Sequence, residues 1–352
     1  MGLRKEELIE LIAKFDEPKY RANQLFSMLY GTRQDDLDLM TNLPKAFRNI
    51  LKNQTHTRAL KLETRYDSED GTRRYLFRTK DGYPVETVYL PTEKRDTICF
   101  SSQSGCALKC DFCLTAKLGL LRNLTAGEIL EQIIAVLNDV YGVGNETPHG
   151  TNLVAMGAGE PFMNYENLLK AFEIMRAEDG LFIVSNRITV STVGIVPKIY
   201  EFAKLEVRPH LAISLSAPND VLREKLMPIN ARWNLSELLK AAKVFERSLK
   251  RGERFTFEYV LINGVNDSVV HALELANLLH DNNFQRTKVN LIAHNSAEGL
   301  DYEAPSEETV LRFKKTLEDR GVSAYVRTPR GRDIFAACGQ LSARGEGIFA
   351  SA

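Results

Sequence analysis

Three cysteines stand close together at Cys106, Cys110 and Cys113. This C-x3-C-x2-C spacing puts three thiolates on one short loop, where they can converge on a single metal centre. A structural zinc ion would need a fourth ligand at matched spacing, and none lies nearby. Three ligands leave one iron of a cubane cluster open, as a site that binds substrate or cofactor at the metal requires. The spacing therefore favours an iron–sulfur cluster, with a zinc ion or unrelated buried thiols as the alternatives.

The composition is that of a folded protein with no need for a structural metal. The 352 residues include 46 Lys and Arg against 46 Asp and Glu, and 44% are hydrophobic. A chain of this length buries roughly three quarters of its unfolded surface, so a cysteine cluster calls for a chemical reason. Zero net charge leaves nucleic acid open as a partner, because a local basic face can still bind phosphates.

The amino-terminal stretch MGLRKEELIELIAKF is charged and amphipathic, unlike a secretory signal. No apolar run reaches the roughly 18 residues that a membrane span needs. We therefore expect a cytoplasmic protein without membrane contact, in a compartment where thiols stay reduced.

The elements that must position the cysteines follow from periodicity. The first fifty residues have helical spacing, and the stretch from Leu60 to Leu90 has short strand-like runs broken by Asp70-Gly71 and Asp81-Gly82, which predict hairpin turns. From Asp96 onward, apolar runs of strand length alternate with helical patterns, one of which opens with a capping box at Thr125 and Glu128. The runs are 97–101, 152–157, 187–191, 210–215, 255–262 and 289–293, with a last candidate at 324–327.

Six βα repeats predict an α/β fold with parallel strands, most simply a partial (β/α)6 barrel. A doubly wound open sheet is the alternative, since strand order cannot be read from one sequence. The expected domains are a helical accessory domain (1–55), a β-hairpin linker (56–91), the core barrel (92–335) and a C-terminal tail (336–352).

Polar residues follow several of these runs. Gly159 and Glu160 follow the second, Ser191 closes the third, Ser216 follows the fourth and Asn295 the sixth. Because functional groups of βα barrels gather at the carboxyl ends of strands, these residues are expected on one face. Taken singly, such residues are more often turn or helix-capping residues.

The cysteine spacing is that of radical S-adenosylmethionine enzymes, and its surroundings resemble the RlmN/Cfr family of RNA methyltransferases. The likeness extends along nearly the whole chain. The segments that carry it are 101–106, 122–129, 156–161, 191–194, 226–230, 264–267 and 333–341.

The resemblance implies a radical SAM barrel with two cofactors, a [4Fe–4S] cluster on Cys106, Cys110 and Cys113 and S-adenosylmethionine. In such a site Gly159 and Glu160 lie against the amino end of S-adenosylmethionine. The residues implied to hold its ribose, carboxylate and adenine side are Ser191, Ser214, Leu215, Ser216 and Asn295.

The resemblance also gives roles to the other two cysteines, although a lone cysteine is ordinarily a small buried apolar residue. It implies that Cys338 receives a methyl group and carries it to RNA. Cys99 would then resolve the protein–RNA adduct through a transient disulfide, an exchange that reductants can reset. Glu86 matches the position of the family's proposed proton acceptor. Without the resemblance, it would be interpreted as a solvated carboxylate on a strand.

The expected activity is methylation of carbon 2 of an adenine in the peptidyl-transferase centre of 23S rRNA, with the tRNA adenosine next to the anticodon as a further candidate. The alternatives are methylation of carbon 8, as in Cfr, and a catalytically inactive RNA-binding or redox paralogue. An electron donor such as flavodoxin and a monomeric state are also expected.

Basic residues that could contact RNA are scattered, and each could equally be a solvated surface charge. They are Lys19, Arg21, Lys117, Arg122, Arg327, Arg330 and Arg332. Three positions depart from the family pattern: Ala158, Ser216, which stands where a His is usual, and the segment 293–296.

Overall fold

The computed structural model describes residues 1–147 and 150–342. The predicted tail, 336–352, is therefore described as far as residue 342, and the remainder lies outside the described residues.

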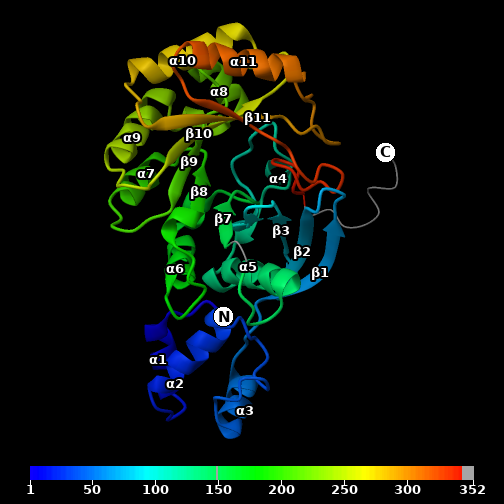
Figure 1. Ribbon diagram of the computed structural model, residues 1–352, viewed down its shortest axis with the longest axis vertical. Coiled ribbons are helices and arrows are strands. Elements are labelled where there is room, and N and C mark those ends of the chain that lie inside the picture. The colour runs from blue at the N-terminus through cyan, green and yellow to red at the C-terminus, as the bar shows by residue number, and fades with distance from the viewer. Residues whose placement is uncertain (148–149, 343–352) are drawn as a thin grey trace.

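One large sheet organises the molecule (Figure 1). Within the described residues ten strands pair in the order β1-β2-β3-β4-β7-β8-β9-β10-β11-β12. From β4 onward every pairing is parallel and neighbours follow chain order. The parallel strands are β4 (Asp96–Cys99), β7 (Thr151–Ala155), β8 (Ile188–Thr192), β9 (His210–Ser214), β10 (Phe255–Leu261), β11 (Thr287–Ala293) and β12 (Ala324–Arg327). A doubly wound sheet would reverse its order at a switch point, so the partial barrel is confirmed and the open-sheet alternative is wrong.

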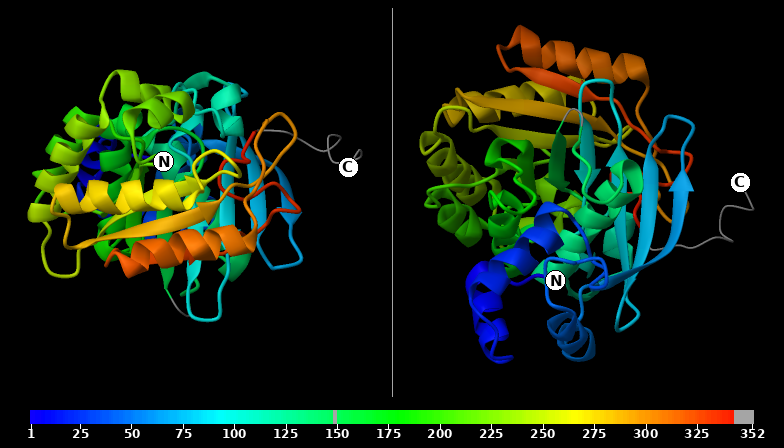
Figure 2. Two further views of the ribbon diagram at one scale, coloured as in Figure 1. Left: turned by 90° about the horizontal axis from the view of Figure 1, so that it is seen from above. Right: turned by 60° about the horizontal axis from the view of Figure 1, so that its bottom comes forward.

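Helices follow the parallel strands and cover the outer face of the sheet (Figures 1 and 2). The predicted capping box at Thr125 and Glu128 is present at the start of α5, and most of that helix is buried. The helices are α5 (Ala126–Tyr141), α6 (Tyr165–Arg176), α7 (Val196–Ala203), α8 (Asp220–Leu226), α9 (Leu235–Arg247), α10 (Val269–Asp281) and α11 (Glu307–Asp319), with short turns η2 (Pro161–Asn164), η3 (Ser185–Arg187) and η4 (Pro228–Ala231).

The segment expected to be a hairpin linker extends the barrel sheet instead. Strands β1 (Leu60–Asp67), β2 (Arg73–Thr79) and β3 (Pro84–Leu90) form an antiparallel meander. Strand β3 also pairs antiparallel with β4, where Val88 faces Cys99. Local patterns show turns but not long-range pairing, which is why the sequence indicated a linker rather than a wall of the barrel.

The amino-terminal helices pack against the barrel at one end of the molecule, beside α5 (Figure 2). Arg33 donates hydrogen bonds to Asn138 Oδ1 and to the carbonyls of Gly142 and Asn145, at and beyond the end of α5. Buried residues of both parts form one hydrophobic core. The elements are α1 (Lys5–Ala13), α2 (Tyr20–Phe26), η1 (Ser27–Gly31) and α3 (Lys45–Gln54).

The cysteine loop is framed by small elements that the sequence did not indicate. A two-stranded sheet, β5 (Gln103–Gly105) and β6 (Leu120–Asn123), flanks it, and α4 (Leu114–Lys117) follows it directly. Among the described helices, none has the length and apolar character needed to cross a membrane.

Candidate functional site

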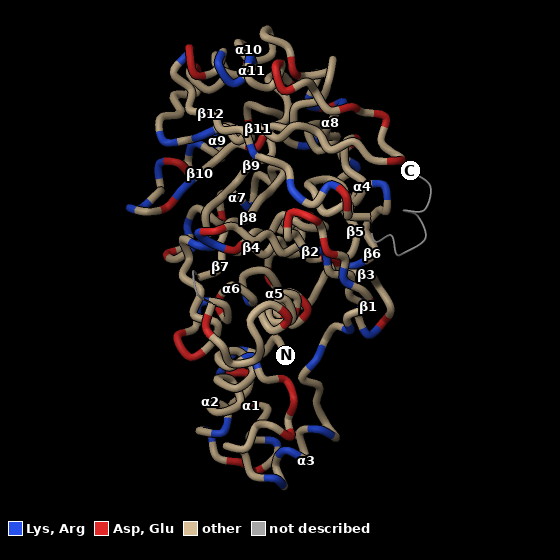
Figure 3. Tube along the Cα trace, turned by 45° about the vertical axis from the view of Figure 1, so that its right-hand side comes forward, with Lys and Arg blue, Asp and Glu red and all other residues tan. Residues whose placement is uncertain are grey.

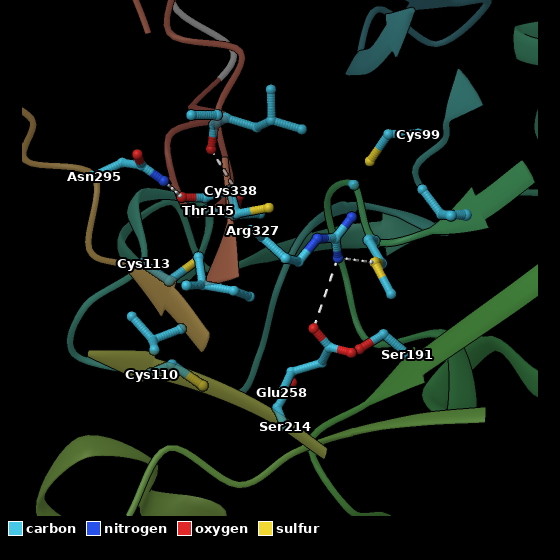
Figure 4. Close-up of a pocket in the computed structure, with 18 of the residues that line it drawn as sticks. Cys99, Cys110, Cys113, Thr115, Ser191, Ser214, Glu258, Asn295, Arg327 and Cys338 are labelled. Carbon is cyan, nitrogen blue, oxygen red and sulfur yellow. Dashed lines mark hydrogen bonds and ion pairs between the residues drawn. The ribbon is translucent and has the colours of Figure 1, made fainter. Parts of the chain in front are cut away.

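A cavity of about 370 Å³ opens at the carboxyl ends of the parallel strands, within the range of ordinary ligand pockets (Figure 4). The cysteine loop and the C-terminal tail complete its walls. Most of the predicted site residues line it: Cys99, Cys106, Cys110, Cys113, Gly159, Glu160, Ser191, Ser214, Asn295 and Cys338. Glu86, Leu215 and Ser216 are not among its lining residues.

The cysteine loop is held in shape by backbone hydrogen bonds. The amide of Cys106 donates to the carbonyl of Gly119 at 2.9 Å, and the amide of Asp111 donates to that of Leu226 at 3.0 Å. Gly105 has φ +73°, a backbone conformation that favours glycine. It also lies against the end of the same loop, where a Cβ would be only 1.9 Å from the carbonyl oxygen of Gly119. Only glycine fits this turn, which brings the loop back beside β6.

Burial makes the three thiols of the loop poor thiolates on their own. It raises the pKa of Cys106 to about 11 and the pKa values of Cys110 and Cys113 above their ordinary value. Neighbouring cysteines raise the pKa of Cys110 further, while the nearby Arg223 acts the other way. Three buried thiolates therefore need a positive centre, which an iron–sulfur cluster supplies, so the donor set fits that group.

A single metal ion, such as zinc, is the alternative to a cluster at these cysteines. No three His, Cys, Asp or Glu side chains within residues 1–147 and 150–342 are grouped closely enough to hold one metal ion. Zinc requires sulfur ligands about 2.3 Å away. A cluster binds each thiolate through a different iron, so its ligands stand further apart. Three thiolates without a fourth protein ligand suit a cluster with one open iron, whereas a structural zinc ion takes four ligands.

Gly159 and Glu160 form a tight turn after β7. Gly159 has φ +98°, and a Cβ there would lie 2.5 Å from Cβ of Gln103. The carboxylate of Glu160 accepts hydrogen bonds from the amides of Phe162 and Val193, each at 2.9 Å. Burial raises the pKa of Glu160 to about 7 against these hydrogen bonds. This turn can therefore present a fixed carboxylate and backbone to the amino end of a ligand.

The serines after the central strands separate into two groups. Ser191 and Ser214 line the cavity. Ser216 is fully buried with φ +52°, its hydroxyl accepts from the amide of Val260 at 3.4 Å and its carbonyl accepts from Asn266 at 2.8 Å. Leu215 is buried in the core. The Ser216 position, where the family usually has His, thus supports the strand ends rather than the cavity wall.

The tail brings Cys338 to the cavity that Cys99 reaches from β4 (Figure 4). Asn295 Nδ2 donates to the carbonyl of Cys338 at 3.1 Å, and Thr115 Oγ1 donates to that of Leu341 at 2.7 Å. The amide of Leu114 donates to the carbonyl of Gly339 at 2.9 Å. Because Leu114 and Thr115 directly follow Cys113, the cysteine loop and the tail are joined. Both Cys99 and Cys338 are free thiols.

The environment of Cys99 keeps its thiol neutral. Burial raises its pKa to about 12, and Cys338 contributes in the same direction, whereas the nearby Arg327 lowers it. A neutral thiol is a weak nucleophile, so Cys99 reacts only when it loses its proton.

Glu86 lies on the face of β3 that carries Val88 and Leu90 but does not reach the cavity wall. Val88 packs in a small cluster with Ile334 and other tail residues. The carboxylate of Glu86 is buried and lies 3.2 Å from Nη1 of Arg74, which is also buried. The sequence indicated a solvated carboxylate for an isolated Glu86, and that interpretation is wrong.

The sequence did not place two charged residues in the cavity. Arg327, a candidate RNA contact, lines the cavity, where its Nη1 lies 3.6 Å from Oε2 of Glu258 (Figure 4). Nearby carboxylate and thiol groups raise the pKa of Arg327 against the effect of burial. The signal for Glu258 was present: one carboxylate interrupts the apolar run 255–262.

The other candidate RNA-binding residues are mostly engaged with neighbouring residues. Arg122 pairs with Asp81 and Glu128. Arg330 pairs with Asp70, and Arg332 donates to Asn295. Basic and acidic residues are interspersed along the trace of the described residues (Figure 3).

Two protein families match parts of the sequence. "Radical SAM superfamily" matches residues 100–276, and "Ribosomal RNA large subunit methyltransferase N-terminal domain" matches residues 1–56.

Curated relatives and a solved structure match nearly the whole chain. "Probable dual-specificity RNA methyltransferase RlmN" of Koribacter versatilis is 46% identical over 344 residues, covering 93% of this chain and 97% of that protein. "Dual-specificity RNA methyltransferase RlmN" of Anaeromyxobacter sp. is 45% identical, with 97% and 89% covered. A crystal structure of a radical SAM methyltransferase from Sphaerobacter thermophilus has a TM-score of 0.92 at 43% identity, covering 97% of this chain and 98% of that one.

Proposed function

The chain belongs to the RlmN family of radical SAM RNA methyltransferases, and we propose that it methylates carbon 2 of an adenine in 23S rRNA and of the tRNA adenosine next to the anticodon. The observation that carries this proposal is one cavity lined both by the three cysteines of the loop and by the distant pair Cys99 and Cys338. A radical SAM enzyme without a methyl carrier would need only the first set.

The loop cysteines Cys106, Cys110 and Cys113 would hold the [4Fe–4S] cluster. Gly159 and Glu160 would hold the amino end of S-adenosylmethionine, and the rest of this ligand would extend along the strand ends that carry Ser191, Ser214 and Asn295. When bound, these cofactors supply a methyl group and, after one-electron reduction, a radical that abstracts hydrogen. Carbon 2 of adenine is electron-poor and does not attack a methyl sulfonium, so a radical route is needed.

Cys338 would be the methyl carrier. Its side chain is exposed at the cavity, while its backbone is held by Asn295 and its neighbours by α4. The methyl carbon on its sulfur would form the bond to the adenine ring. After that carbon has lost one hydrogen atom and bonded to the ring, the adduct would give up one electron, for which the cluster would be the acceptor. The Cys99 thiolate would then attack the sulfur of Cys338 and form a disulfide. The electron pair of the broken sulfur–carbon bond would pass to the methylene carbon, which takes up a proton to become the product methyl group.

Glu86 would accept the ring proton that must leave for aromaticity to return. Its buried ion pair with Arg74 fixes the carboxylate on the strand face that meets the tail. Proton transfer from the cavity to this position needs a short relay or a movement of the tail.

We also propose a one-electron donor such as flavodoxin as a partner, a monomeric state and a cytoplasmic location. The cluster loop supports the first, since Ala107 and Lys109 between its ligands are exposed and give a donor access to the centre.

An anaerobic reaction tests the proposal. Reconstituted protein, S-adenosylmethionine and a reductant are incubated with unmodified 23S rRNA and tRNA, and nuclease digests are analysed by mass spectrometry. The expected product is 2-methyladenosine. Detection of 8-methyladenosine instead would assign the protein to the carbon-8 chemistry, and unmodified adenosine would contradict both. Formation of no deoxyadenosine would favour the inactive paralogue.

A further inference from the structure

A buried carboxylate oxygen in the cavity lacks a hydrogen-bond donor. Glu258, on β10, is 5% exposed and lines the cavity. Its Oε2 is buried and accepts no hydrogen bond within the described residues. The nearest cation, Nη1 of Arg327, is 3.6 Å away, which is too long for a hydrogen bond. Apart from this ion pair, no described residue donates to the oxygen, although buried polar atoms are normally hydrogen-bonded.

The orientation of this carboxylate is fixed from the sheet side. Its other oxygen, Oε1, accepts from Oγ1 of Thr256 at 2.9 Å and from Nδ2 of Asn290 at 2.8 Å. Asn290 is the register partner of Glu258 on β11. With Oε1 held by two donors, Oε2 is directed away from them, toward Arg327 in the cavity (Figure 4).

The guanidinium of Arg327 balances the carboxylate without completing its hydrogen bonding. It donates to Sδ of Met156 at 3.7 Å and lies in the same cavity wall as Cys99 and Cys338. A carboxylate oxygen that accepts from a hydroxyl makes a short, strong hydrogen bond. An O–H or N–H group of a ligand in the cavity could supply this hydrogen bond.

The position of Glu258 points to the ribose of the cofactor. Its register partner on β9 is Ser214, and Ser191 lines the same cavity from β8. Both serines belong to the wall proposed above for the ribose and carboxylate of S-adenosylmethionine. Adjacent ribose hydroxyls pair well with a carboxylate, because each can donate one hydrogen bond to it.

We infer that Glu258 is a further cofactor-binding residue, whose Oε2 accepts a hydrogen bond from a ribose hydroxyl of S-adenosylmethionine. This inference rests on the proposed function for its cofactor. In this arrangement Thr256 and Asn290 are positioning residues, since they orient the carboxylate from outside the ligand.

A binding measurement tests the inference without turnover. Anaerobically reconstituted protein is titrated calorimetrically with S-adenosylhomocysteine and with its 2′-deoxy and 3′-deoxy derivatives. Glu258→Gln keeps the size but can present an amide group in place of Oε2, so affinity for S-adenosylhomocysteine should fall about 10- to 100-fold. The wild-type protein and the variant should bind the derivative that lacks the contacted hydroxyl with affinities within about twofold of each other. This is expected because the Glu258 carboxylate and that hydroxyl form a coupled pair, so once one is removed the other has little effect.

The matched control is Glu253→Gln, which makes the same change just before the opposite end of β10, where Glu253 pairs with Arg208 outside the cavity. It should leave all three affinities unchanged. If Glu258→Gln does not fold, the wild-type titrations decide alone: at least one deoxy derivative should bind 10-fold or more weakly, and equal affinity for all three ligands would overturn the inference.

The remaining outcomes are also decisive. Unchanged binding of S-adenosylhomocysteine by Glu258→Gln overturns the inference, and a raised KM for RNA alongside it would assign Glu258 to the target adenosine instead. Wild-type protein that binds no S-adenosylhomocysteine would overturn the inference together with the cofactor assignment. Binding without RNA methylation would contradict the proposed function alone.

Discussion

The two sets of cysteines in this protein are assembled in different ways. Cys106, Cys110 and Cys113 lie on one loop whose shape is set by its own turns, above all at Gly105. Cys99 and Cys338 come from strand β4 and from the C-terminal tail, and only the docked tail brings them to one cavity. The proposed cluster site is therefore built from residues close together in sequence, whereas the proposed methyl-transfer site depends on tertiary contacts. The two sets should therefore fail separately.

The largest expected effect is loss of RNA methylation in Cys338→Ala. This variant lacks the proposed carrier sulfur but keeps the whole cysteine loop, so its iron content should match that of the wild type. The matched change Cys110→Ala should lose both iron and methylation. Iron analysis and nuclease digestion measure the two properties, and methylated RNA from Cys338→Ala would refute the carrier role.

The next effect is trapping of RNA in Cys99→Ala. Without the thiol that attacks the sulfur of Cys338, the bond between protein and RNA should persist after one turnover. A slower-migrating, nuclease-sensitive species on a denaturing gel is expected, with iron content again unchanged. Free, fully methylated RNA as the only product would contradict the assigned role of Cys99.

The pH dependence of thiol reactivity should separate Cys99 from Cys338. Burial first, and then Cys338, raise the pKa of Cys99 from 9.0 to about 12. The reactive thiolate therefore forms only as the pH rises toward 12, and at pH 8 it should be about a thousandfold scarcer than for an ordinary thiol. Alkylation with iodoacetamide, followed by peptide mass spectrometry, should label Cys338 first. Equal labelling at pH 8 would show that the tail leaves Cys99 open.

The smallest effect concerns docking of the tail. Thr115→Val removes the hydrogen bond to the carbonyl of Leu341, worth about 1 kcal/mol. Release of the tail should then become up to about fivefold more frequent, seen as faster hydrogen exchange of the tail amides, with no loss of iron. Thr316→Val, which removes a local hydrogen bond on α11, is the matched control. Identical exchange in the two variants would mean that other contacts hold the tail.

The sequence predicted the local features of this protein well and the long-range ones poorly. The cysteine loop, the strand runs and the capping box at Thr125 depend on near neighbours in the chain, and the fold class was confirmed. Pairing of β3 with β4 and the approach of Arg74 to Glu86 depend on contacts that no local pattern encodes.

The same reason explains what the sequence did not indicate at the site. Arg327 was named only as a candidate RNA contact, and its place in the cavity wall beside Glu258 depends on the pairing of strands that are distant in sequence. Ser216 was expected beside the cofactor; it is not among the lining residues of the cavity, and its carbonyl accepts a hydrogen bond from Asn266. Charged residues inside apolar runs, such as Glu258, are the sequence signal that could have been used.

The most direct test of the central claim follows the methyl group itself. Reconstituted protein is given S-adenosylmethionine with a deuterated methyl group, and the peptides are analysed by mass spectrometry before and after RNA is added. The account predicts that the label appears on the peptide that contains Cys338 and then moves to carbon 2 of adenine in the RNA. Labelled RNA formed while Cys338 never carries a methyl group would contradict it.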